Sequence, residues 1–100
     1  MATPALEISA GNDGPPSRRA TDVFVAGSDF PAGTAVNIKI SAGGARPLRG
    51  TANVRADGSF DWSASVRPKL SCNAAVGAIV HGSDGLQVTA STEVFCPAVP

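Results

Sequence analysis

Large aromatic and sulfur-containing side chains are scarce in this chain of 100 residues, which has no tyrosine, one tryptophan and one methionine. Few aromatic rings leave little surface for stacking bases or sugars, which disfavours binding of single-stranded nucleic acid or carbohydrate. Eight basic and eight acidic side chains cancel, so bulk attraction to nucleic acid or to an anionic membrane has no basis. No run of about 20 apolar residues occurs, and we expect no membrane-spanning helix.

The chain has a single histidine, His81, which limits its catalytic chemistry. A triad with Ser83 and Asp84 would have to form within one turn, where triad geometry is hard to reach. Two cysteines and one histidine fall short of the four ligands of a structural zinc site. The loop carboxylates are not grouped in a dense Asp-x-Asp run, which favours turn formation over calcium binding, and they lie at Asn12-Asp13, Asp29, Asp57 and Asp84. We therefore expect no enzyme activity, no metal and no cofactor.

The sequence is instead a series of short alternating segments separated by Gly, Pro and Asp. The clearest is 35–41, because Val36, Ile38 and Ile40 alternate with polar residues at the period of a β-strand. The other expected strands are 6–9, 21–27, 48–55, 59–66, 72–81 and 86–96. About seven strands at roughly 10-residue spacing predict one all-β domain over residues 1–100, an antiparallel β-sandwich. Residues 1–20 would supply its N-terminal strand and a long polar loop.

The stretch 72–96 predicts a C-terminal hairpin stapled by a disulfide. Two apolar runs flank a Gly/Ser/Asp cluster, and a turn centred on Asp84 places Val80 opposite Val88 and Cys72 opposite Cys96. Directly opposed strand residues are about 4.5–5.5 Å apart, which suits a disulfide. A bond enclosing ~25 residues would contribute roughly 3 kcal/mol of stability. The alternative is a reactive or metal-binding cysteine pair.

Three large apolar residues fall out of phase with the expected core. If the two valines that flank Phe24 point inward, Phe24 points outward, and Ile79 and Phe95 face outward if the final hairpin buries its even positions. Exposed apolar side chains that gather into a patch mark protein contacts. The alternative is that loops or a register bulge cover them. Arg18 and Arg19 in the long loop are further candidate contacts, since loops on rigid scaffolds often bind partners.

Basic residues are concentrated between positions 39 and 69. Six lie there against Asp57 and Asp61, and they are Lys39, Arg46, Arg49, Arg55, Arg67 and Lys69. On a sandwich they would make a positive side for docking on an acidic protein surface, and scattered solvated charge is the alternative. Trp62 is in phase with Phe60 and is expected in the core rather than on a carbohydrate-binding surface.

Two motifs resemble bacterial and phage immunoglobulin-like modules. The stretch 23–36 reads Val-Phe-Val-Ala-Gly-Ser-Asp-Phe-Pro-Ala-Gly-Thr-Ala-Val, similar to the turn between two strands of those modules, and 56–60 is similar to their Asp-Gly-Ser-Phe hairpin. The resemblance covers about residues 20–96. The antibody-type arrangement is absent, since Trp62 precedes both cysteines. The resemblance implies a binding, adhesion or structural role.

These observations predict a non-enzymatic structural or binding module. A chain that starts at Met1 without an export signal, yet has a cysteine pair, fits a phage virion accessory protein released within a particle. We expect a capsid decoration or tail-associated protein that docks on a protein lattice, with homo-oligomers on that lattice left open, and no nucleic-acid or membrane partner. The alternatives are an adhesion domain of a secreted or cell-surface bacterial protein and a small-ligand carrier sandwich.

Overall fold

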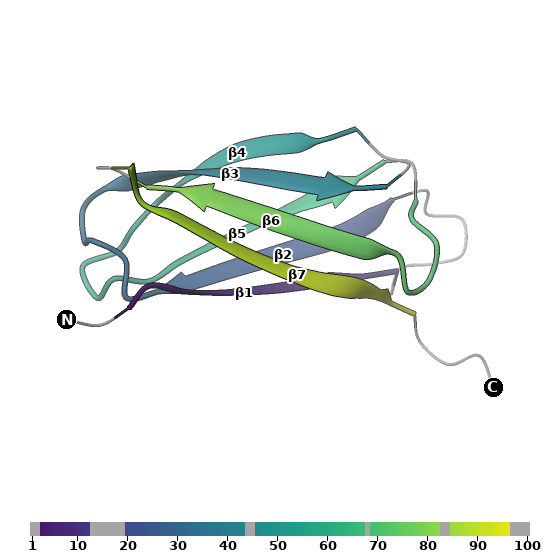
Figure 1. Ribbon diagram of the computed structural model, residues 1–100, viewed down its shortest axis with the longest axis horizontal. Coiled ribbons are helices and arrows are strands. Elements are labelled where there is room, and N and C mark those ends of the chain that lie inside the picture. Colours follow the sequence, from purple (N-terminus) through teal and green to yellow (C-terminus); the bar gives the residue numbers. More distant parts are fainter. Residues whose placement is uncertain (1–2, 13–19, 44–45, 68, 83–84, 97–100) are drawn as a thin grey trace.

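The computed structural model describes residues 3–12, 20–43, 46–67, 69–82 and 85–96, which form seven β-strands (Figure 1). The strands are β1 (Ala5–Gly11), β2 (Thr21–Ser28), β3 (Ala35–Ala42), β4 (Leu48–Asn53), β5 (Phe60–Val66), β6 (Ala75–His81) and β7 (Gln87–Phe95). Each coincides within a few residues with a segment expected from the alternating pattern. The all-β prediction is therefore confirmed.

The strands pair in the order β4-β3-β6-β7-β1-β2-β5. Five of the pairs are antiparallel, but β1 and β7 run parallel, with Ala10 opposite Val94 and Gly11 opposite Phe95. The expectation of a wholly antiparallel arrangement is wrong at this pair, which joins all seven strands into one mixed sheet. Pairing with β1 also covers the end of β7, which would otherwise be an open edge. Because β4 and β5 at the two ends of the order contact each other, the sheet curls almost into a barrel.

The core lies inside the curled sheet and follows the predicted alternation. Val23 and Val25 are buried while Phe24 between them is exposed. Phe30 is buried in the core, with its ring edge-on to that of Phe60 at a centroid distance of 5.0 Å. Trp62 is only partly buried, and its indole occupies the space into which a side chain at position 50 would point, which explains the glycine there.

The terminal hairpin has the predicted register, with Val80 opposite Val88. The predicted disulfide between Cys72 and Cys96 is present, with a Cα–Cα distance of 5.7 Å. β6 begins three residues later than expected, because Asn73 adopts a positive φ of 66° and turns the chain just after Cys72. The bond therefore links the turn before β6 to the residue after β7.

A polar cluster next to the disulfide was not predicted from the sequence. Thr21 is fully buried, and its hydroxyl donates to Asn12 Oδ1 and accepts from the backbone N–H of Leu70 at 2.9 Å. The Asn12 amide donates to the Leu70 carbonyl at 2.8 Å and to Cys96 Sγ at 3.6 Å. The cluster ties the ends of β1 and β7 to the start of β2, and every buried side-chain donor and acceptor among the described residues is satisfied.

Candidate functional site

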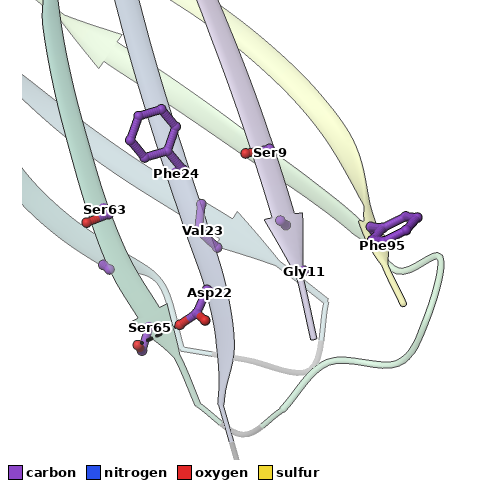
Figure 2. A pocket seen from close by; sticks show the side chains of 10 residues that line it. Ser9, Gly11, Asp22, Val23, Phe24, Ser63, Ser65 and Phe95 are labelled. Carbon is purple, nitrogen blue, oxygen red and sulfur yellow. Dashed lines mark hydrogen bonds between the residues drawn. The ribbon is translucent and has the colours of Figure 1, made fainter. Parts of the chain in front are cut away.

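The outer surface of β1, β2 and β5 has an open groove of about 730 Å³ (Figure 2). The strand register lays out its centre: Ser9 lies beside Phe24, and Phe24 beside Ser63. Gly11 and Ser65 occupy the next positions along their strands and also line the groove. The floor is thus made of small side chains, which lets a partner approach the backbone closely.

Two phenylalanines flank this floor. Phe24 on β2 and Phe95 on β7 stand on opposite sides of β1 in Figure 2, and they are 46% and 67% exposed. Phe95 is opposite Gly11 in the parallel pair, so no side chain from β1 covers it. Both residues were predicted to face outward, and both do. We call the surface made by Phe24, Phe95 and the small residues between them the phenylalanine groove.

The acidic residue of the phenylalanine groove is Asp22, which lies between Gly11 and Ser65 in the register. Its carboxylate accepts a hydrogen bond from the Ser65 hydroxyl at 3.2 Å. A hydrogen-bonded carboxylate beside exposed aromatic rings gives the surface both an apolar and a polar means of contact, as at the hydrophobic centre and polar rim of protein interfaces.

The remaining predicted contact residues do not join this groove. Ile79 lies on β6, where it is half-buried and paired with Lys39 and Thr89, so it belongs to a different part of the surface. The single face of Phe24, Ile79 and Phe95 expected from the sequence is therefore corrected to a pair of phenylalanines. Arg18 and Arg19 lie outside the described residues.

A second groove, of about 640 Å³, lies on the outer surface of β3 and β4 and reaches His81 on β6. Lys39 is directly opposite Arg49 in the antiparallel β3–β4 pair, and Asn37 lies between Thr51 and His81. We call these five residues the basic groove. The sequence signal for this pairing was present, because a hairpin centred on position 44 places residue 39 opposite residue 49.

The six basic residues between positions 39 and 69 do not all share one side. Only Lys39 and Arg49 line the basic groove. Arg55 instead forms an ion pair with Asp61 of β5, with Nη2 and Oδ2 2.6 Å apart and both side chains 53% exposed. Of these six residues the basic groove therefore brings together only Lys39 and Arg49, with His81 nearby.

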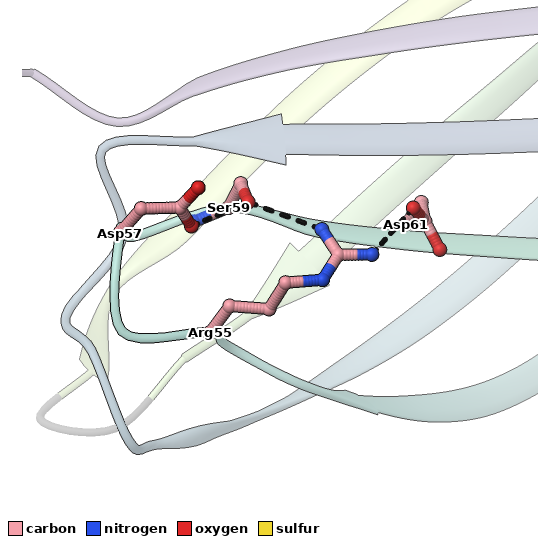
Figure 3. A network of polar contacts seen from close by, with 4 residues as sticks. All are labelled: Arg55, Asp57, Ser59 and Asp61. Carbon is pink, nitrogen blue, oxygen red and sulfur yellow. Dashed lines mark hydrogen bonds and ion pairs between the residues drawn. The ribbon is translucent and has the colours of Figure 1, made fainter.

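The turn between β4 and β5 is a polar network built on Asp57 (Figure 3). Its carboxylate accepts hydrogen bonds from the Ser59 hydroxyl at 2.6 Å and from the Ser59 backbone N–H at 3.0 Å. These bonds, the hydroxyl first, lower the pKa of Asp57, while the hydrogen bond to Asp61 and the charge of Asp61 raise the pKa of Arg55. Asp57 thus acts in the turn as predicted, and the network is structural.

His81 is exposed, and Ser83 and Asp84, with which a triad was considered and not expected, lie outside the described residues. In the described part of the chain, no helix is long and apolar enough to cross a bilayer. No protein-family model matches the sequence, and no curated protein matches it. A functional assignment therefore depends on the two grooves and the fold.

Proposed function

We propose that this chain is a non-enzymatic protein-binding module with an immunoglobulin-like β-sandwich fold. The strand order supports the fold assignment, because β4-β3-β6-β7 and β1-β2-β5 form two groups that enclose one core and meet mainly through β1 and β7. The Gly-x-x-Phe-Pro-x-Gly turn supports it as well, since Phe30 of that turn is buried in the core.

The observation that carries the proposed activity is the pair of exposed phenylalanines in the phenylalanine groove. At 46% and 67% exposure they offer roughly 200 Å² of aromatic surface, given about 200 Å² for a whole phenylalanine side chain. Burying that area against a partner would release roughly 5 kcal/mol before the entropic cost of association. Aromatic residues that stand out from a rigid sheet are typical interface anchors.

The disulfide indicates an oxidising setting, extracellular or secreted. Within that setting we propose a virion accessory role, as a capsid decoration or tail-associated protein that docks on a repeated protein surface. A secreted or cell-surface adhesion domain remains the second candidate, because the same disulfide and the same groove would serve it. Both grooves open on the outer face of the curled sheet rather than into its interior, which favours a macromolecular partner over a carried small ligand.

Site-specific photo-crosslinking in the native source tests the proposed function. A photoreactive phenylalanine analogue at position 24 or 95 should crosslink to one protein, whereas the same analogue at Ala56, which is exposed in the turn between β4 and β5 and lines neither groove, should not. Binding of that protein to a variant carrying Phe24→Ser and Phe95→Ser should weaken at least tenfold, because both apolar anchors are lost. Unchanged binding by this variant, or equal crosslinking from position 56, would refute the assignment.

A further inference from the structure

The basic groove contains an arrangement that is unfavourable for folding. Lys39 and Arg49 face each other directly across β3 and β4, and like charges in that position destabilise a sheet. Among the described residues neither has an ion-pair partner, since the ion pair there joins Arg55 to Asp61. The stability of the isolated domain therefore does not explain why Lys39 and Arg49 face each other, whereas an anion bound between them would relieve their repulsion.

The surroundings of the pair supply neutral hydrogen-bonding groups and a third basic side chain. Asn37, Thr51 and His81 are exposed beside it and line the same groove of about 640 Å³. Neighbouring strands are about 4.8 Å apart, and successive outward residues of one strand are about 6.8 Å apart. A peptide that lies along β3 with a carboxylate at Lys39 and Arg49 therefore extends over Asn37 and Thr51, the next outward pair of the two strands.

The chemistry of the groove favours a peptide over a nucleic acid or a glycan. None of the five aromatic residues of the chain lines this groove. Phe30 and Phe60 are buried, and the indole of Trp62 lies on the inner side of the sheet against Gly50. Phe24 and Phe95 belong to the phenylalanine groove. Bases and sugar rings therefore lack a stacking platform here. The amide, hydroxyl and basic groups suit the backbone and carboxylates of a peptide.

We propose that the basic groove is a second docking surface, which binds an extended acidic segment of a protein partner through carboxylate contacts to Lys39 and Arg49. The inference rests on the proposed protein-binding function and adds the chemistry of the bound segment. Charge complementarity places the acidic side chains over the cross-strand pair, and the backbone of the segment over Asn37 and Thr51.

Residue-resolved NMR titration tests this proposal. An eight-residue peptide that alternates Glu and Thr, titrated into the ¹⁵N-labelled protein at low salt, should shift the amide signals of Lys39, Arg49 and Thr51. The same peptide with Gln in place of Glu should leave them unmoved. A variant with Lys39→Gln and Arg49→Gln should bind at least tenfold more weakly, because both cationic contacts are lost.

A matched variant with Arg67→Gln and Lys69→Gln removes the same charge from exposed positions outside the groove and should bind as the parent does. The variant Arg49→Glu should lose peptide binding while its Tm rises by a few degrees, because opposite charges then face each other. That combination separates a binding role from a structural one.

Four results would overturn the inference: equal shifts from the Gln peptide, full binding by the groove variant, an equal loss in the matched variant, or tighter binding of a heparin fragment or oligodeoxythymidine of the same charge. The Phe24→Ser, Phe95→Ser variant should still bind the acidic peptide. The proposed binding role of the phenylalanine groove and that of the basic groove are therefore tested by separate measurements, and either can be refuted without the other.

Discussion

Removal of the disulfide is the perturbation with the largest expected effect on the fold. The bond joins residues separated by 24 positions, so a loop of about 25 residues is closed in the unfolded chain. The chain-entropy relation gives about 3.5 kcal/mol for such a loop, a sizeable fraction of the 5–15 kcal/mol that is typical of small domains. For a domain of this length each kcal/mol corresponds to about 4–8 °C, so Tm should fall by roughly 14–28 °C.

The assay is thermal and denaturant unfolding, followed by circular dichroism, of the parent and of a variant carrying Cys72→Ser and Cys96→Ser. The parent measured in reducing agent provides the matched comparison, because it loses the bond but keeps both sulfur atoms. The reduced parent should be somewhat more stable than the variant, since Cys96 is half-buried against the core and its sulfur accepts a hydrogen bond from Asn12.

A Tm change of less than about 5 °C on removal of the disulfide would refute this reasoning. It would mean that the β6–β7 pairing and the hydrogen bonds among Asn12, Thr21 and Leu70 already stabilise the end of the hairpin without the bond, or that the unfolded chain is compact without the bond. Reducing agent should have no effect on the double variant, and any effect there would show that the change in the parent is not due to the disulfide.

Two further predictions concern single residues. Gly27→Ala should destabilise by about 1–3 kcal/mol in urea unfolding, because the added Cβ would lie 2.1 Å from Cε1 of the buried Phe60 ring; the exposed Gly43→Ala, with nothing within 4 Å, should be nearly neutral. Asp57→Ala should lower stability near neutral pH, and this difference from the parent should vanish in acid. Because hydrogen bonds lower the folded pKa of Asp57 below its ordinary 3.8, its contribution is complete above that value and is lost as pH falls through the folded pKa; a difference that does not shrink as the solution is acidified would contradict it.

The local part of this fold was predictable because short-range rules determine it. The hairpin register followed from one turn position, since residues close in sequence pair around their turn, and the disulfide followed from that register. The burial of Val23 and Val25 and the exposure of Phe24 followed from the period of two, because strand residues alternate between the faces of a sheet.

The non-local part was not predictable in the same way. The parallel pairing of β1 with β7 joins segments more than 80 residues apart, and no turn chemistry sets its register. The buried Thr21 hydroxyl depends on Asn12 and Leu70, which come together only through that pairing and the curl of the sheet. For the same reason, the sequence could place Phe95 on the outside but could not place it beside Gly11 and across β1 from Phe24.

The alternation that builds the core also leaves the outward positions free of folding constraints. An outward residue that lowers the stability or solubility of the domain is therefore informative, because a neutral residue could have stood at that position. Phe24 exposes an aromatic ring where its neighbours in the register are serines, and Lys39 repels Arg49 where one opposite charge would have stabilised the pair. These two costs fall on separate surfaces, one apolar and one basic. A single partner that spans both would bind with an association constant equal to the product of the two separate constants and the effective concentration of its second segment, provided that its segments reach both sites together.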